Sequence, residues 1–217
     1  MKYFKSFITI PIVFFAMSCS DDIERTYWEN GNIQSALRYN ESGELEGLAQ
    51  WYYESGGLQQ EATYLGNSLH GQMTRYHNNG SIESIGWYKD NLRDSLLLNY
   101  NMLGVKTAEA NYHNDTLHGK FARYYADGQP MIEGEYYRGM LNGTWLFYDQ
   151  TGAVIGKADY HLGDGIQKAW HSNGKISRIM YYKDNLQHGK DEHYDRQGRL
   201  LQTDYYEQGE LIREEIH

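Results

Sequence analysis

The sequence predicts an all-β repeat protein of about eight β-hairpins, and three observations lead to that fold class. Glycine and aromatic residues recur about every 24 residues from residue 27 onward. Side chains between the glycines alternate with a period of two, which is typical of β-strands. Only 2 of the 217 residues are proline and 15% are aromatic, which argues against a disordered chain. Self-similarity of this kind indicates an array of repeated units.

A glycine that recurs at spacings of 22 to 25 residues defines the repeat, and a tyrosine follows each copy. A further aromatic residue lies four positions before each glycine, so that fifteen of the 21 tyrosines occupy two repeat positions. We assign these positions to the fold itself. The repeat positions are Gly31, Tyr39, Gly56, Tyr64, Gly80, Tyr88, Gly104, Tyr112, Gly128, Tyr136, Gly152, Tyr160, Gly174, Tyr182, Gly198 and Tyr206.

A second glycine series accompanies the first, in most units about seven residues after the tyrosine. Ser95 replaces the glycine in one unit, and Gly165 comes two residues early because its unit is short. Most of these glycines follow Asn, Asp or His, which are the residues that best tolerate positive φ. Asn-Gly and Asp-Gly are also strong hairpin signals. We therefore predict hairpin turns here and interpret His118, before Gly119, as a turn residue.

The segments between the glycines predict the strands. Leu58, Gln60, Ala62 and Tyr64 share one face of an alternating pattern, in which an aliphatic residue opens the strand, a small residue follows and tyrosine closes it. The other units repeat this order. Each unit is therefore two short antiparallel strands, and eight units give about sixteen strands.

The Tyr-x-x-x-Gly-x-aliphatic pattern, as in YHNNGSI from Tyr76, and the Leu-His-Gly stretches at Leu69 and Leu117 resemble the MORN repeat family. The similarity is to the bacterial variant found in YwqK-type antitoxin proteins, and it runs from about Tyr27 to Tyr206. The resemblance implies an elongated, single-layer antiparallel meander. Eight units would span about 75 Å at a strand spacing of about 4.8 Å.

The first residues resemble a bacterial lipoprotein signal. Lys2 and Lys5 precede an apolar run that is too short to span a bilayer, and Cys19 is the only cysteine. The following Ser-Asp-Asp resembles the export tag of Bacteroidota surface lipoproteins. We predict a signal peptide at 1–18, lipidation of Cys19, an acidic tether at 19–26, a repeat array at 27–217, and a surface-exposed outer-membrane location. The alternative is an ordinary cleaved signal peptide.

The net charge of the chain limits the classes of molecule that it can bind. Removal of residues 1–18 would leave 18 basic and 29 acidic side chains, a formal charge of -11. An acidic surface repels polyphosphate, so nucleic acid is excluded as a partner class, and anionic headgroups are disfavoured. We expect membrane contact through the lipid anchor only. Phospholipid recognition, which the family's full name suggests, is disfavoured for the same reason.

The residue patterns do not predict catalysis or a bound metal. His70 and His118 lie two units apart, about 19 Å along the sheet, which is too far for one zinc ion. His113 and His118, like His188 and His193, are closer together, but neither pair brings a third ligand with it. No nucleophile elbow or phosphate-binding loop occurs. We expect no enzymatic activity, no cofactor and no metal.

Aromatic residues outside the two repeat positions are the predicted contact residues. They are Trp51, Tyr53, Trp87, Tyr125, Tyr137, Trp145 and Phe147. A continuous exposed strip of such side chains would be typical of a protein interface. We therefore expect a protein-interaction scaffold, and the alternative is a glycan-binding surface protein that stacks sugars on its aromatic rings. The family resemblance implies that the protein partner is a basic toxin, which this chain would bind as an antitoxin or immunity protein.

Overall fold

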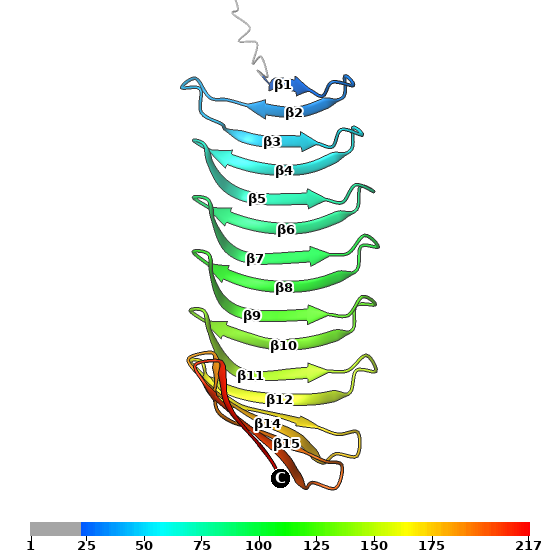
Figure 1. Ribbon diagram of the computed structural model, residues 1–217. Helices are drawn as coiled ribbons and strands as arrows, with labels where there is room; N and C mark the ends of the chain where they lie inside the picture. Colours follow the sequence, from blue (N-terminus) through cyan, green and yellow to red (C-terminus); the bar gives the residue numbers. More distant parts are fainter. Residues whose placement is uncertain (1–22) are drawn as a thin grey trace, which may run out of the picture.

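The computed structural model describes residues 23–217 as one open antiparallel sheet of seventeen strands, and this part of the chain contains no helix (Figure 1). The predicted all-β meander is therefore confirmed. The strands are β1 (Ile23–Tyr27), β2 (Ile33–Arg38), β3 (Gly47–Tyr52), β4 (Leu58–Leu65), β5 (Ser68–Tyr76), β6 (Ile82–Lys89), β7 (Leu92–Tyr100), β8 (Lys106–His113), β9 (Thr116–Tyr124), β10 (Pro130–Tyr137), β11 (Met140–Tyr148), β12 (Val154–His161), β13 (Asp164–Trp170), β14 (Ile176–Lys183), β15 (Leu186–Tyr194), β16 (Leu200–Glu207) and β17 (Glu210–Ile216).

Consecutive strands pair with each other from β1 to β17, so the chain forms a ladder of hairpins in one layer (Figure 1). The later strands, from about β13, twist away from the plane of the earlier ones in the same view. The sheet begins at Ile23, which places residues 23–26 of the predicted tether in β1. The predicted signal peptide and Cys19 lie outside the described residues. Among residues 23–217, no helix is long and apolar enough to cross a membrane.

Two-residue turns close one margin of the sheet. Both residues of these turns have positive φ, as in Asp90 (51°) with Asn91 (70°) and Asn114 (48°) with Asp115 (61°). Two consecutive residues with positive φ are the signature of a type I′ hairpin turn, whose twist matches that of the flanking strands. The predicted position of the turns was therefore wrong by a few residues. His118 lies inside β9, after the turn, because Asn114 and Asp115 already supply the turn conformation.

The second glycine series forms β-bulges. Gly71 (φ +114°) pairs with Tyr88, and Gly119 (φ +101°) pairs with Tyr136, next to register shifts in the adjoining hairpins. Positive φ favours glycine because a Cβ atom would clash with the backbone there. Ser95 adopts the same conformation with φ 96°. These residues therefore sit opposite the tyrosines and bend the strand.

The first glycine series closes the other margin of the sheet in longer loops. Its eight glycines have φ between 77° and 91°. Two backbone hydrogen bonds to the first residue of the loop close each of these loops. In the loop of Gly80, Gly80 N donates to His77 O at 2.9 Å, and His77 N donates to Ser81 O at 2.8 Å. The sequence predicted this role for the glycines from their spacing alone.

One face of the sheet, called face A, carries the tyrosines that close β4, β6, β8, β10, β12, β14 and β16. Residues paired across strands share a face, and so do residues two apart in a strand. The register therefore defines a central row on face A, running Ala49, Ala62, Met73, Gly86, Leu97, Ala110, Phe121, Gly134, Trp145, Ala158, Gln167, Met180, Asp191 and Asp204.

Large and small residues alternate along this row as far as β12. A Cβ atom at Gly134 would overlap the ring of Trp145, so glycine is what lets the indole lie flat on the sheet. Trp145 is 4% exposed and packs edge-on against Tyr136 at 5.0 Å between ring centroids. Together with Ala158 and Tyr160 it forms the hydrophobic core cluster of the sheet. Burial raises the pKa of the Tyr160 hydroxyl.

The opposite face, called face B, carries the aromatic residues that precede the first glycine series. Tyr76 donates to Glu61 Oε1 at 2.7 Å, and Tyr148 donates to Glu133 Oε2 at 2.8 Å. Burial first, and then the hydrogen bond and charge of Glu61, raise the pKa of Tyr76 to about 12. The two tyrosine series of the repeat thus pack on opposite faces, one ring against ring and the other hydroxyl against carboxylate.

Candidate functional site

The unit formed by β12 and β13, called the short unit, is the place where the repeat changes. Its register runs without a shift from Gly156↔Ala169 to His161↔Asp164, so this hairpin lacks the bulge of its neighbours. Gly165 therefore sits directly opposite Tyr160 with ordinary φ. A Cβ atom at Gly165 would overlap the Asp159 carbonyl, which explains why glycine persists there. The missing residues account for the spacing of 22 seen in the sequence.

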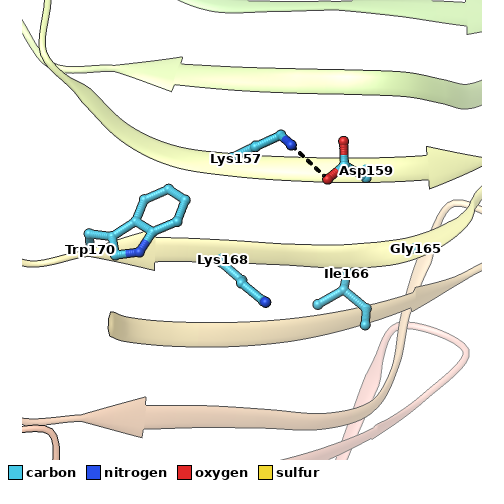
Figure 2. Close-up of a pocket in the computed structure, with 6 residues that line it drawn as sticks. All are labelled: Lys157, Asp159, Gly165, Ile166, Lys168 and Trp170. Carbon is cyan, nitrogen blue, oxygen red and sulfur yellow. Dashed lines mark ion pairs between the residues drawn. The ribbon is translucent and has the colours of Figure 1, made fainter. Parts of the chain in front are cut away.

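A hollow of about 530 Å³ opens on face B of the short unit, and we call it the short-unit hollow. It is lined by Lys157, Asp159, Gly165, Ile166, Lys168 and Trp170 (Figure 2). Figure 2 shows Lys157 and Asp159 on one strand, and Ile166, Lys168 and Trp170 along the next. The register places these side chains on the same face, because Lys157 pairs with Lys168 and Asp159 with Ile166.

The hollow concentrates positive charge in an acidic protein. Lys157 and Lys168 are directly opposite each other, an arrangement of like charges that destabilises a sheet. Lys157 Nζ lies 3.0 Å from Asp159 Oδ2, whereas Lys168 has no ion pair among residues 23–217. The hydrogen bond from Thr144, followed by that from Lys157, lowers the pKa of Asp159. One lysine is therefore only partly neutralised, and the other is available to a ligand.

The same positions in the preceding unit show what the short unit has lost. Glu133 lies opposite Leu146, and Tyr148, two residues further on, donates its hydroxyl to that glutamate. In the short unit Lys157 takes the place of the glutamate and Trp170 that of the tyrosine. The hydroxyl–carboxylate contact is thus replaced by an amine and an indole. The fold does not need this exchange, because the neighbouring units close without it.

The predicted contact residues do not form one strip. Trp145 is buried, so its prediction as an exposed contact residue was wrong, and Phe147 packs against the same core cluster. Trp51, also on face A, lies edge-on to Tyr64 at 6.1 Å between centroids. Trp87, opposite Gln72, lies on face B and is half-buried. The sequence showed that these aromatics were irregular, but not that they occupy different faces.

Three further predicted contact residues, all tyrosines, lie at the margins of the sheet. Tyr125 donates its hydroxyl to the Tyr148 carbonyl at 2.8 Å, as Tyr53 does to Tyr76 at 2.7 Å, so both rings tie neighbouring loops together. Tyr137 remains 42% exposed and lies 5.2 Å from the ring of His118. Of the predicted contact residues, Tyr137 is the one that the structure leaves most exposed. Sequence reasoning missed Trp170, because it counted that residue as a regular copy of the repeat aromatic.

The histidines of the chain have separate roles. His77 and His171 each place Nε2 on the carbonyl of an aromatic residue one unit ahead, at 3.0 and 2.9 Å. His193 lies within 3.3 Å of Asp191 and of Asp204. The sequence could not show this cluster, since the two aspartates come from neighbouring strands and are brought together only by the register of β15 and β16.

Comparison with known proteins supports the repeat assignment. The family model described as MORN repeat variant matches five segments, residues 23–41, 45–65, 69–90, 117–136 and 163–184. No curated protein matches the chain. Similar solved structures include crystal structures of TcdB2-TccC3-Cdc42 (11% identity, TM-score 0.18), TcdB2-TccC3 (10%, 0.18) and TcdB2-TccC3-TEV (12%, 0.17). The alignments cover 85% of this chain and only 14 to 15% of those chains.

Five segments of the chain therefore match the MORN repeat variant, and they are parts of one open ladder of hairpins. Repeats of this type are in general interaction repeats, directed at proteins or membranes, and are in general not enzymes.

Proposed function

We propose that this protein is a non-enzymatic protein-interaction module, and that the short-unit hollow is its main contact site. The observation that carries the proposal is that Lys157 and Trp170 occupy the positions where the preceding unit has the hydrogen-bonded pair Glu133 and Tyr148. Exposed apolar side chains also gather nearby, since Ile155 and Ile166 are 42% and 41% exposed. An aromatic and cationic hollow of this kind is typical of the residues that anchor protein partners.

The charges define the partner. Lys157 and Lys168 repel each other, so a carboxylate placed between them would relieve that repulsion while an apolar group rests on Trp170. The formal charge of the whole chain is -9, which favours a partner that is basic overall. We infer a basic protein that presents one acidic side chain to the hollow.

The predicted location gives this binding a biological setting. A lipid on Cys19 would hold the repeat array at the outer membrane, where it could act as an immunity-like protein against a basic toxin. An anchored copy does not meet a toxin acting in its own cytoplasm, so the contact would take place in the envelope. Substitution Cys19→Ser is expected to release the protein from the membrane fraction. Retention of the variant in that fraction would argue against the anchor.

The binding test uses the intact surface-displayed protein. We expect affinity capture from cells to recover the same polypeptide with the wild type and with Lys120→Glu, and to lose it with Lys168→Glu or Trp170→Ala. Lys120 is a suitable control because it is an exposed lysine that pairs with Glu135 on the same face, outside the hollow. Raising the salt concentration should weaken capture, since exposed charges are screened. Equal recovery with all variants would refute the site.

A glycan is the second candidate ligand, favoured by the indole of Trp170 beside polar groups in an open hollow. Aromatic rings stack on sugars without needing charge. Glycan binding would therefore survive Lys168→Glu and high salt but be lost with Trp170→Ala. Glycan-array binding of these two variants separates the two functions.

A further inference from the structure

The central row of face A becomes polar in the last units. From Ala62 to Ala158 this row contains apolar side chains or glycine, whereas β15 and β16 contribute Asp191 and Asp204 to it, directly opposite each other. Both are buried, with side-chain exposures of 0% and 10%. Burial of two like charges in contact is costly unless a cation lies between them. The repeat closes elsewhere with apolar residues, so the fold does not require this pair.

His193 completes a three-residue cluster. Its Nε2 lies 3.3 Å from Asp191 Oδ1 and 3.3 Å from Asp204 Oδ2, and the ligand atoms of all three residues fall within 4.8 Å of one another. This nitrogen is buried and has no hydrogen-bond partner. Neutral imidazole nitrogen and carboxylate oxygen are both ligands of zinc. A nitrogen that lies at ion-pair distance from two buried carboxylates, without hydrogen-bonding to either, is placed as a metal ligand would be.

Two of the three separations between the ligand atoms fit a tetrahedral ion, and all three are within 4.8 Å. Ligands bound to Zn²⁺ at about 2.0 to 2.1 Å in a tetrahedron lie about 3.3 to 3.4 Å from one another. The two separations between His193 and the aspartates have this value. Three protein ligands leave the fourth position of a tetrahedral ion open.

Neighbouring side chains hold the carboxylates in place. Arg178 Nε donates to Asp191 Oδ1 at 2.8 Å, and Gln187 donates to Asp191 Oδ2 at 3.0 Å. Gln202 donates to Asp204 Oδ1 at 2.6 Å, which leaves Asp204 Oδ2 without a hydrogen bond among the described residues. Hydrogen bonds of this kind orient the ligands of metal sites. The oxygen left free on Asp204 is the one that faces His193.

We propose that Asp191, His193 and Asp204 bind a divalent cation of the zinc class. The site lies on face A, whereas the short-unit hollow lies on face B, so neither depends on the other. The bound ion would neutralise the two opposed carboxylates and lock β15 to β16. Its fourth position would accept water or a donor atom from a partner.

The test is a zinc titration of the chelator-treated, full-length protein by calorimetry. We expect one Zn²⁺ per chain, and a loss of affinity of at least about tenfold with His193→Gln or Asp204→Asn. Zinc should also raise the melting temperature of the wild type and not of these variants. His188→Gln is the matched control, because His188 lies on the same strand and outside the cluster.

Asp191 is left unchanged in the test because its bonds to Arg178 also support the fold. Circular dichroism establishes that each variant keeps its strands. Absence of one-to-one binding by the wild type would overturn the proposal. So would unchanged affinity in both His193→Gln and Asp204→Asn, since zinc would then bind elsewhere.

Discussion

The units up to β12 and those from β13 onward fill the central row of face A with different kinds of side chain. In the earlier units the central row of face A alternates large and small apolar residues, ending in the Trp145–Ala158 pair. In the later units the same row holds Gln167, Asp191 and Asp204. Buried apolar contacts support the first region, and a hydrogen-bonded ion-pair network supports the second.

This difference shows that the fold requires apolar side chains in the central row of face A but tolerates polar ones there. A single-layer sheet has no second layer to cover its core, so neighbouring units must fill the row with side chains of matching size. Where polar groups replace that filling, stability alone does not account for them, because buried ion pairs add little over well-packed apolar residues. The later units are therefore where we place the metal cluster, and the contact site lies at β12 and β13, where the two regions meet.

The largest expected effect comes from emptying the apolar row. Trp145→Ala removes a ring that is 4% exposed and leaves Gly134 facing a cavity. We expect the free energy of unfolding to fall by about 3 to 5 kcal/mol, measured by urea denaturation. Trp87→Ala is the control of the same residue type, half-buried on face B, and should cost clearly less. Equal losses would mean that face A has no special role in the core.

The second largest loss of stability is expected from a change in the polar part of the central row of face A. Arg178→Met leaves the buried carboxylate of Asp191 without its main partner and should cost about 3 kcal/mol. The double variant Arg178→Met with Asp191→Leu should recover most of that loss, because it removes the uncompensated charge. Arg123→Ala, an exposed arginine of face A with no ion pair among residues 23–217, is the control. A double variant as unstable as the single one would show that the network itself is required.

The smallest effect concerns the hydroxyl–carboxylate contacts of face B, which the short unit lacks. In the folded protein the pKa of Tyr76 is raised to about 12, above the ordinary tyrosine value of 10.0. The stabilisation by its neutral form is complete below about pH 10 and is lost as the pH rises towards about 12. Urea denaturation at about pH 9 and about pH 11 should show a smaller decline for Tyr76→Phe than for the wild type. An identical decline in both would mean that this contact does not titrate.

Periodicity was sufficient to predict the fold, because the repeat positions of glycine and tyrosine are those that the hairpins use. The closing tyrosines and the small residues of β4 to β12 occupy the predicted positions, whereas β14 and β16 carry Met180 and Asp204 where a small residue was expected. The exact turns were missed, since Asn114 and Asp115 do not contain the glycine that usually marks a hairpin. Tight turns here depend on two polar residues that tolerate positive φ.

The sites were harder to predict, because they depend on register and on the face to which each residue points. Trp145 looked like an irregular, exposed aromatic and is buried. Trp170 looked like a regular repeat residue, yet it lines the hollow, because its partner position holds a lysine. A comparison of units at each strand position, rather than of aromatics alone, would have shown Lys157 as a charge reversal. Asp191 and Asp204 would have stood out in the same way.

Ahead of β10, the margins of the ladder are closed by bonds between neighbouring units, such as Asn91 N to the Leu69 carbonyl at 3.0 Å, whereas beside the short unit Asn185 reaches two turns back, to Leu141 N at 2.8 Å. Duplication or loss of a whole 24-residue copy ahead of β10 would therefore preserve every kind of junction. Each added copy would shift the hollow by about 9.6 Å, from a starting distance of about 50 Å beyond β1. The number of copies thus sets the distance between β1 and the short-unit hollow, and this distance can change without any change in the hollow itself.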